Sequence, residues 1–283
     1  MEKETHLDVA IGQRHMVSNF VKEFVRHHAP NQPVPPTIIL DQYDDEHCDD
    51  DGGDSDMILS TITLQIQIQI KDFGGSFAMP HYGHLHPSVN YFNSNFMVSN
   101  FVVVDLISNS NDVFFYDERA QGKDVDALFS LRFTYHLEKF KTLLSHKITM
   151  PKTLLVILDN CVGQNKSYLV MQLFTMLSIL FYLKVVLVYL IPRHSHNTAN
   201  WVITWCRNVM KGKNFYSPMA IIEAVNEVKG VNTSFIDHRD ARRPCYVSWG
   251  PILKKHFKSL LARYTFNYFF EFDEGHVNMR SLC

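Results

Sequence analysis

Two aspartates in this sequence follow stretches that have the composition of β-strands. Asp159 comes directly after the apolar run Leu154–Leu158 and precedes a polar turn, and Asp72 follows the alternating run Thr61–Lys71. In open α/β sheets, ligands bind beyond the carboxyl ends of strands, where loop backbone and helix N-termini leave polar groups unpaired. Either aspartate alone is more often an ordinary turn residue. At corresponding ends of two strands, they predict a pair of carboxylates in one site.

A carboxylate pair at this position could hold divalent cations that act on phosphodiesters. Oxygen ligands suit Mg²⁺ or Mn²⁺, and two such ions about 3.5–4 Å apart activate a nucleophile and stabilise the leaving oxygen. A third acidic ligand is expected after the apolar run 184–191, but the next Asp or Glu in the sequence is Glu223. Asn200 is the nearest substitute, and its neutral oxygen should weaken the binding of a second ion.

Basic side chains flank the expected site on two segments. Arg193, His194 and His196 follow the run 184–191. The two histidines could ligate a metal, although a pair with one intervening residue is more often part of a polar loop. Gly163–Lys166 precedes an expected helix, a pattern that favours phosphate contact through backbone N–H groups and the lysine ammonium. An ordinary helix-start turn explains the same residues, and the Walker spacing of an NTPase is absent. We predict that Lys166, Arg193, His194 and His196 face nucleic-acid phosphates.

The spacing of apolar residues predicts strands and helices in a regular order. Alternation from Ile62 to Ile70 indicates a half-buried strand, and two short β-rich runs follow, separated by the turn sequence Ser-Asn-Ser-Asn. The expected elements are strands 61–71, 101–106 and 113–116, helix 124–146, strand 153–158, helix 166–183, strand 184–191 and helix 198–211. This β-β-β-α-β-α-β-α order is that of the RNase H-like fold, a mixed five-stranded α/β sheet flanked by helices.

The remaining segments are expected to surround this domain. We predict an amphipathic helix over 1–28, a Pro-rich and acidic flexible linker over 29–60, the RNase H-like domain over 61–225 and a C-terminal extension over 226–283. The acidic run 41–56 has too many mutually repelling carboxylates for a packed element. It also lacks the ligand spacing of a calcium-binding EF-hand.

Composition narrows the function classes. A net charge of −2 over 283 residues provides no general basic field, so nucleic-acid binding would depend on a local patch. Five cysteines without a C-x-x-C pair, and no apolar signal segment, favour a reduced intracellular setting. The apolar run from Tyr168 to Ile191 is long enough to consider as a membrane span. Lys184 within it favours a buried helix followed by a buried strand.

Three sequence blocks resemble an uncharacterised, transposon-derived RNase H-like family of eukaryotes. They are D-N-C-V-G-Q-N-K-S at 159–167, P-R-H-S-H-N-T-A-N-W at 192–201 and D-F-G-G-S-F-A-M-P-H-Y-G-H-L-H-P at 72–87. The first two are similar to that family's D-N-C-x-G-Q-N-K-N and G-H-T-x-N-x-x-D-R blocks, and the resemblance extends over about residues 60–225. It implies a DDE-type transposase or integrase-like domain that cleaves or joins phosphodiesters with Mg²⁺ or Mn²⁺. Asp72 and Asp159 would hold the metal, and Asn200 would stand at the third catalytic position.

The departures from this family concern its third acidic ligand above all. Asn200 and Trp201 stand where the family has Asp and Arg, Arg193 replaces its Gly, and His86 replaces its Gln. The chain also begins directly at the expected spacer helix, without an upstream DNA-recognition region. We therefore expect a decayed or partial element product with impaired catalysis. The resemblance implies DNA as partner, with RNA as an alternative, no membrane association and a nuclear location, and it leaves a homo-oligomer open.

A non-catalytic module on the same fold, binding nucleic acid or protein, is the alternative function. Its candidate surface mixes basic and aromatic residues, which suits stacking and phosphate contact, although amphipathic packing explains such a mixture more often. These residues are Arg239, Arg242, Arg243, Lys254, Lys255, Lys258 and Arg263, with Tyr246, Trp249, Phe257 and Tyr264. Salt-dependent binding that survives loss of Asp159 would favour this alternative.

Overall fold

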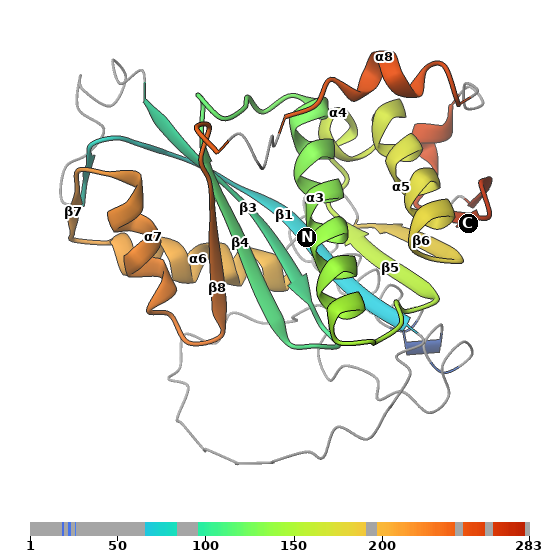
Figure 1. Ribbon diagram of the computed structural model, residues 1–283, viewed down its shortest axis with the longest axis horizontal. Coiled ribbons are helices and arrows are strands. Elements are labelled where there is room, and N and C mark those ends of the chain that lie inside the picture. Colours follow the sequence, from blue (N-terminus) through green and yellow to red (C-terminus); the bar gives the residue numbers. More distant parts are fainter. Residues whose placement is uncertain are drawn as a thin grey trace, which may run out of the picture.

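A long strand, β1 (Ile66–Ala78), crosses the middle of an eight-stranded sheet in the computed structural model of the protein (Figure 1). The structure describes residues 66–83, 96–190, 197–240, 246–257 and 263–280, together with residues 19, 22, 23 and 26. The predicted linker over 29–60 lies outside these residues, as does nearly all of the helix predicted over 1–28. His86, one of the departures from the family pattern, also lies outside them.

The sheet is mixed, and its strands follow the order β10-β9-β6-β5-β1-β3-β4-β8. The pairs β1–β3, β3–β4, β6–β9 and β9–β10 are antiparallel, whereas β1–β5, β5–β6 and β4–β8 are parallel. The strands beside β1 are β3 (Met97–Asp105), β4 (Ser110–Asp117), β5 (Thr153–Leu158), β6 (Lys184–Tyr189), β8 (Val231–Ile236), β9 (Phe269–Asp273) and β10 (His276–Arg280). A second, two-stranded sheet joins β2 (His81–Tyr82) to β7 (Asn214–Phe215).

Helices cover both faces of the large sheet, so the predicted mixed α/β architecture is confirmed. Helices α3 (Val125–Ser145) and α5 (Tyr168–Leu180) pack on one face, and α6 (Thr198–Met210) and α7 (Pro218–Asn226) pack on the other. Short helices complete the set: α4 (Val162–Asn165), α8 (Trp249–Leu253) and the 3₁₀ turn η1 (Tyr264–Phe266). The sheet is larger than the five strands predicted, because β8, β9 and β10, all from residues after 225, extend it at both edges.

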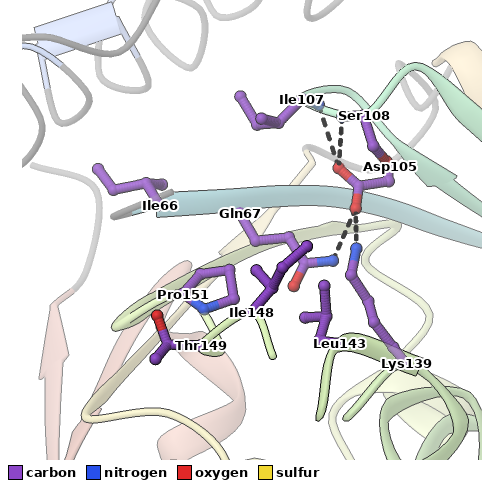
Figure 2. A pocket seen from close by; sticks show the side chains of 10 residues that line it. All are labelled: Ile66, Gln67, Asp105, Ile107, Ser108, Lys139, Leu143, Ile148, Thr149 and Pro151. Carbon is purple, nitrogen blue, oxygen red and sulfur yellow. Dashed lines mark hydrogen bonds and ion pairs between the residues drawn. The ribbon is translucent and has the colours of Figure 1, made fainter. Parts of the chain in front are cut away.

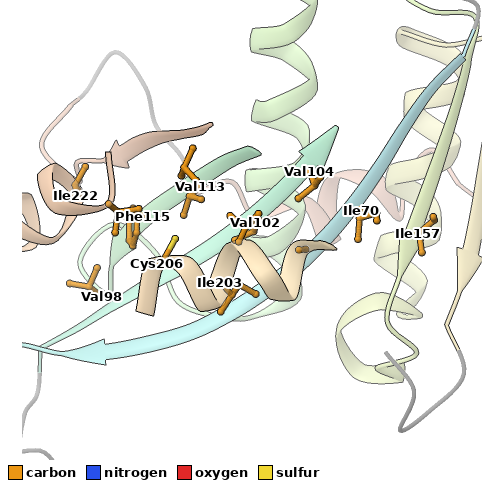
Figure 3. Close-up of a cluster of buried hydrophobic side chains, with 14 of the residues drawn as sticks. Ile70, Val98, Val102, Val104, Val113, Phe115, Ile157, Ile203, Cys206 and Ile222 are labelled. Atoms are coloured by element: carbon orange, nitrogen blue, oxygen red, sulfur yellow. The ribbon is translucent and has the colours of Figure 1, made fainter. Parts of the chain in front are cut away.

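Alternation along the strands divides the core between the two faces. On β5, Leu155 and Ile157 belong to the cluster beneath α6 and α7, whereas Leu154, Val156 and Leu158 belong to the cluster beneath α3 and α5. Figure 3 shows the first cluster, in which Ile203 and Cys206 of α6 approach Val102 of β3. This period-2 pattern determines which side chains of β1 and β5 can meet α6.

The apolar run 168–191 is divided between α5, which has 13 residues, and β6. Within the residues that the structure describes, no helix is long and apolar enough to cross a membrane. A helix was predicted over 166–183, but α5 is shorter at both ends. It begins after Ser167, whose side chain caps it, and the separate short helix α4 ends at Asn165. The run follows the predicted order of a buried helix and a buried strand.

The start of α3 depends on a side-chain cap. The Asp124 carboxylate accepts a 2.8 Å hydrogen bond from the Ala127 backbone N–H, one of the four N–H groups without a partner inside the helix. We expect Asp124→Ala to lower the free energy of unfolding by about 1 kcal/mol, measured by urea denaturation. Glu138→Ala, which removes only an exposed pair with Lys141, is the control and should change stability by less than about 0.5 kcal/mol. Equal effects of the two substitutions would contradict the capping role.

Candidate functional site

Asp72 and Asp159 occupy neighbouring positions on the central parallel pair of strands. The register pairs Lys71 of β1 with Leu158 of β5, so the next residue of each strand is one of the two aspartates. By alternation each follows the face of Ile70 and Ile157, which is the face covered by α6. The two carboxylates predicted from sequence therefore come together, and both are half-buried.

The strand position of Asp72 differs from the prediction. Asp72 was expected at the end of a strand over 61–71, but β1 continues to Ala78 alongside β3. The register shifts only between Phe73 and Gly75, after the aspartate. Because this bulge follows Asp72, the carboxylate stays on the isoleucine face, opposite the point where β5 ends.

Asn200 brings the first turn of α6 to the same site. Its Nδ2 donates a 2.8 Å hydrogen bond to Asp72 Oδ2. Its Oδ1 accepts a 2.9 Å bond from the Asn197 backbone N–H, which completes a reciprocal capping box at the start of α6. Since the capping box uses the only oxygen of this amide, an N–H group faces Asp72 at the third position.

Asn165 and Arg132 complete the polar arrangement around Asp159. Asn165 Nδ2 donates to Asp159 Oδ1, and Asn165 Oδ1 accepts from Arg132 Nη2. The Tyr189 hydroxyl fixes the Asn165 backbone by donating a 2.6 Å bond to its carbonyl oxygen. Arg132 is buried, and its Nε and Nη1 have no hydrogen-bond partner among the residues that the structure describes. The guanidinium therefore acts on the two carboxylates mainly through its charge.

Burial and mutual repulsion tune the charges of this site. Burial raises the pKa of Asp72 to about 6, and the nearby charge of Asp159 adds to this rise, while the Phe73 N–H and the Asn200 amide oppose it. Burial lowers the pKa of Arg132 to about 10, against the attraction of the two aspartates. At neutral pH a mostly ionised Asp72 thus lies near the buried cation Arg132.

The ligand set does not fit a two-ion centre. Three of the four carboxylate oxygens accept N–H donors: Asp72 Oδ1 from Phe73, Asp72 Oδ2 from Asn200 and Asp159 Oδ1 from Asn165. Hard divalent ions need several oxygen ligands each, preferably charged. In the described parts of the chain, no group of three or more His, Cys, Asp or Glu side chains could hold a metal. The arrangement instead surrounds the carboxylates with one cation, Arg132, and with hydrogen bonds from two side-chain amides.

Lys166 does not lie where the sequence suggested. Its side chain is only 1% exposed, and its ammonium donates a 3.0 Å hydrogen bond to the Thr265 carbonyl oxygen. The ammonium also lies 4.7 Å from the Tyr189 ring centroid and 4.5 Å from that of Tyr268. Burial lowers its pKa to about 8. Contact with a phosphate was predicted for this ammonium, but it is enclosed by aromatic rings and does not reach the surface.

The other predicted phosphate contacts, Arg193, His194 and His196, lie outside the described residues. The same is true of Arg242, Arg243 and Lys258 in the basic and aromatic segment. Within the described part of that segment, the Trp249 ring stacks on Phe129 with centroids 4.5 Å apart, and Phe257 and Tyr264 pack against the same core. Arg239 pairs with Asp237. These aromatic side chains therefore serve packing, the alternative explanation of the pattern.

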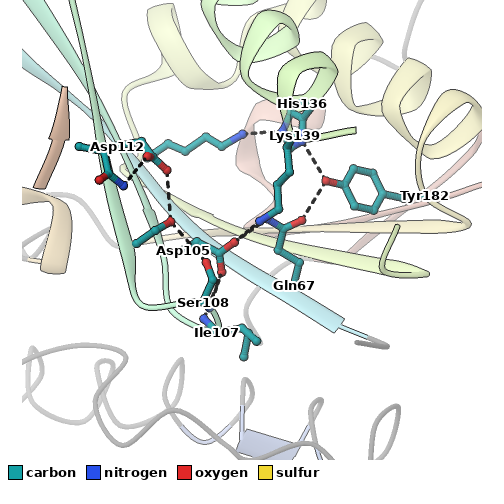
Figure 4. Close-up of polar contacts among 11 residues, drawn as sticks. Gln67, Asp105, Ile107, Ser108, Asp112, His136, Lys139 and Tyr182 are labelled. Carbon is teal, nitrogen blue, oxygen red and sulfur yellow. Dashed lines mark hydrogen bonds and ion pairs between the residues drawn. The ribbon is translucent and has the colours of Figure 1, made fainter. Parts of the chain in front are cut away.

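A second polar network lies on the opposite face of β1, beneath α3 (Figure 4). Lys71 contacts His136 at 2.8 Å, His136 contacts the Tyr182 hydroxyl at 2.9 Å, and this hydroxyl donates to Gln67 Oε1 at 3.0 Å. Gln67 in turn donates to Asp105, which also accepts from Lys139. Burial lowers the pKa of Lys71 and of His136 well below their usual values. Each member has a partner within the network, which is typical of a structural role.

A small pocket opens beside this network, at the start of β1, whereas Asp72 lies in the middle of that strand (Figure 2). Its polar members, Gln67, Asp105 and Lys139, bond to one another. Apolar side chains such as Ile66, Leu143 and Ile148 form much of the remaining wall. Ser108 bonds to Ser110, and Thr149 is exposed to solvent, so no set of convergent, unpaired polar groups in this wall suggests a ligand.

Sequence reasoning missed Arg132, Asn165 and Tyr189 as parts of the carboxylate site. Asn165 was considered only as part of a phosphate-binding turn. The sequence could have indicated a buried role for Arg132, because this residue lies four positions after Leu128 on the apolar face of its helix, where a charged residue is unusual. Tyr189 gave no such signal, since a tyrosine at the end of a buried strand is ordinary.

Comparison with known proteins gives one partial match. A family model described as "Domain of unknown function (DUF7869)" matches residues 131–239, which is less than half of the chain. No curated protein and no solved structure matches significantly. The matched segment contains Arg132, Asp159, Asn165 and Asn200 but not Asp72. The chain is thus similar to this family over the part that supplies most of the site.

Proposed function

We propose that residues 66–225 form an RNase H-like domain of transposase descent, related to DDE-type enzymes that cleave and join phosphodiesters. The adjacent strands β4-β3-β1-β5-β6 support this proposal, since the first three are antiparallel and the last two run parallel to β1. Helix α3 connects β4 to β5, α5 connects β5 to β6, and α6 follows β6. This is the order of elements expected of the RNase H-like fold.

The observation that carries the proposal is the meeting of three side chains from separate elements. Asp72 comes from β1, Asp159 follows β5, and Asn200 lies in the first turn of α6. These are the positions at which the resemblance to the transposon-derived family expects its acidic residues. Residues 41 to 128 positions apart in sequence would rarely converge in this way by simple packing.

Catalysis is impaired in this chain under the proposal. The third position presents an amide N–H instead of a carboxylate oxygen, and Arg132 supplies a positive charge next to the remaining pair. Each 1.4 kcal/mol of lost transition-state stabilisation is about a tenfold loss of rate. The ancestral reaction would have used Mg²⁺ or Mn²⁺ on DNA, with RNA as a second substrate class and the nucleus as the place of action.

Asn200→Asp tests the proposal by restoring the third carboxylate. We expect this variant to nick supercoiled plasmid DNA in the presence of Mn²⁺ at least tenfold faster than the parent chain, a gain of about 1.4 kcal/mol. Aspartate also suits the first turn of a helix. Asn208→Asp, the same substitution on an exposed position of α6, is the control and should not change the rate.

The double variant Asn200→Asp, Asp159→Asn identifies the source of any cleavage. If the site does the chemistry, the second substitution abolishes the restored nicking. Nicking that persists in the double variant, or a parent chain whose nicking ignores Asp159→Asn, would contradict the proposal. Thermal melting of each variant shows whether a lost activity reflects unfolding.

A non-catalytic binding module on the same fold is the second candidate function. The observation that favours it is that protein groups stabilise the carboxylates, Arg132 through its charge and Asn165 and Asn200 through hydrogen bonds. A site that has replaced its metal ligands with protein donors no longer needs an ion to be stable. Such a domain can keep the surfaces that hold nucleic acid after it has lost the chemistry.

A further inference from the structure

Two of the three tryptophans of the chain are exposed side by side on α6. Trp201 is 41% exposed and Trp205 is 37% exposed. Residues four positions apart lie on the same face of a helix, one turn from each other. The opposite face of α6 is buried in the core through Val202, Ile203 and Cys206. The core therefore already has its apolar stripe, and the tryptophans are additional to it.

Basic residues accompany the tryptophans without any acidic neighbour in sequence. Arg207, Lys211 and Lys213 are exposed, and no Asp or Glu occurs between Asn197 and Ile222. The whole chain has 29 acidic and 27 basic residues, so this segment differs clearly from the average. An acid-free segment with three cations attracts an anionic partner.

The same surface continues past the end of α6. Tyr216, which follows strand β7, is 73% exposed and meets Tyr82 edge to face with ring centroids 6.2 Å apart. Lys213 directly precedes β7. Between Trp201 and Tyr216 the sequence thus carries exposed cations flanked by aromatic rings on both sides.

This surface adjoins the carboxylate site. Trp201 follows Asn200, which bonds to Asp72. Farther along the helix, Arg207 Nη2 donates a 2.9 Å hydrogen bond to the carbonyl oxygen of Gly74, two residues beyond Asp72. Helix α6 is therefore tied to β1 at both ends of its exposed face, which keeps the tryptophans in a defined position.

We propose that the α6 surface, formed by Trp201, Trp205, Lys211, Lys213 and Tyr216, binds single-stranded nucleic acid. The indole and phenol rings stack with bases, and the cations contact phosphates. Charge decides between this partner and an apolar protein segment, because the cations at this surface would be desolvated without compensation against apolar side chains. The inference rests on the nucleic-acid partner of the proposed function but needs neither Asp72 nor Asp159.

Intrinsic fluorescence tests the contact directly in the full chain. Because Trp201 and Trp205 are two of the only three tryptophans, oligo(dT) or oligo(U) that stacks on them should quench most of the emission of the exposed indoles. Quenching by either oligonucleotide supports the inference, and the stronger of the two identifies the preferred nucleic acid. Absence of quenching at low salt by both would overturn it.

Variants separate stacking from general affinity. By fluorescence anisotropy of a labelled oligonucleotide, Trp201→Ala and Trp205→Ala should each weaken binding at least fivefold, whereas Trp201→Phe should retain most of it. Phe266→Ala, which removes a 71% exposed ring from a different surface, is the control and should bind as the parent does. Unchanged affinity of the doubly alanine-substituted chain, with an unchanged melting temperature, would overturn the inference.

The lysines are tested through the salt dependence of binding. Lys211→Gln and Lys213→Gln should each reduce the slope of log K against log salt by about 0.7, the value for one phosphate contact on a single strand. Lys254→Gln and Lys255→Gln, on exposed positions at the end of α8, should leave the slope unchanged. Asp159→Asn should keep full oligonucleotide binding. If Asn200→Asp shows no nicking while the oligonucleotide still binds, the proposed catalytic site is contradicted and the α6 binding surface is not.

Discussion

Arg132→Met is expected to lower the free energy of unfolding by about 3 kcal/mol. The buried guanidinium is the cation that acts on Asp72 and Asp159, and it fixes Asn165 through Nη2. Removing one partner of a buried charge arrangement costs about 3–5 kcal/mol. The lower end applies here, because the carboxylates are half-buried and two guanidinium nitrogens have no hydrogen bond to lose.

Urea denaturation at pH 7.5 measures this effect, with Arg239→Met as the control. Arg239 also pairs with an aspartate, but its side chain is 77% exposed, so its loss should change stability far less than the loss of Arg132. Mg²⁺ should raise the melting temperature of Arg132→Met more than that of the parent chain, since an ion can then replace the missing charge. Equal stability of the Arg132 variant and the parent would show that the guanidinium does not compensate the carboxylates.

Asp72→Asn is expected to stabilise the protein by about 2 kcal/mol at pH 8 and to flatten its stability between pH 4 and 6. The folded-state pKa of Asp72 is about 6, against an ordinary value of 3.8. Within this window the folded state holds a proton that the unfolded state has released, so stability falls as the pH rises. Above pH 6 the ionised Asp72 lowers the free energy of unfolding by its full amount, about 3 kcal/mol. The lost hydrogen bond with Asn200 offsets about 1 kcal/mol of the gain.

Melting temperatures of the parent and Asp72→Asn from pH 4 to 8 give the measurement. The two curves should converge toward pH 4 and separate up to pH 6. Asp237→Asn is a control of opposite sign, because Arg239 holds the pKa of Asp237 at about 2 and its carboxylate is therefore stabilising at neutral pH. If the melting temperatures of the parent and Asp72→Asn change with pH in parallel, the ionised Asp72 does not destabilise the folded protein.

Local sequence patterns predicted the main strands and helices from β1 to α6, although not β2, α4 or the true bounds of β1. Helical spacing over 124–146 corresponds to α3 at 125–145, and the apolar run 153–158 is β5. The proximity of Asp72, Asp159 and Asn200 followed from the order of these elements, since parallel strands bring their carboxyl ends to one edge.

The rest depended on contacts that local patterns do not encode. Strand β8 has the short, mixed sequence Val-Asn-Thr-Ser-Phe-Ile without a clear alternation, and its pairing with β4 joins residues more than 100 positions apart. The burial of Lys166 depends on Tyr268 and Thr265, which arrive from a distant segment. The charge balance at Asp159 likewise required knowing that Arg132 faces inward on α3.

The last strands have a consequence for how the protein is synthesised. Strand β8 covers the outer edge of β4, and β9 covers that of β6, although both come from residues after 225. At about 5–20 residues per second, the ribosome needs roughly 3 to 11 s to make residues 226–280. During that interval a nascent chain that has completed α6 exposes two unpaired strand edges, the surfaces through which chains associate. Protection by chaperones is therefore needed most at this stage.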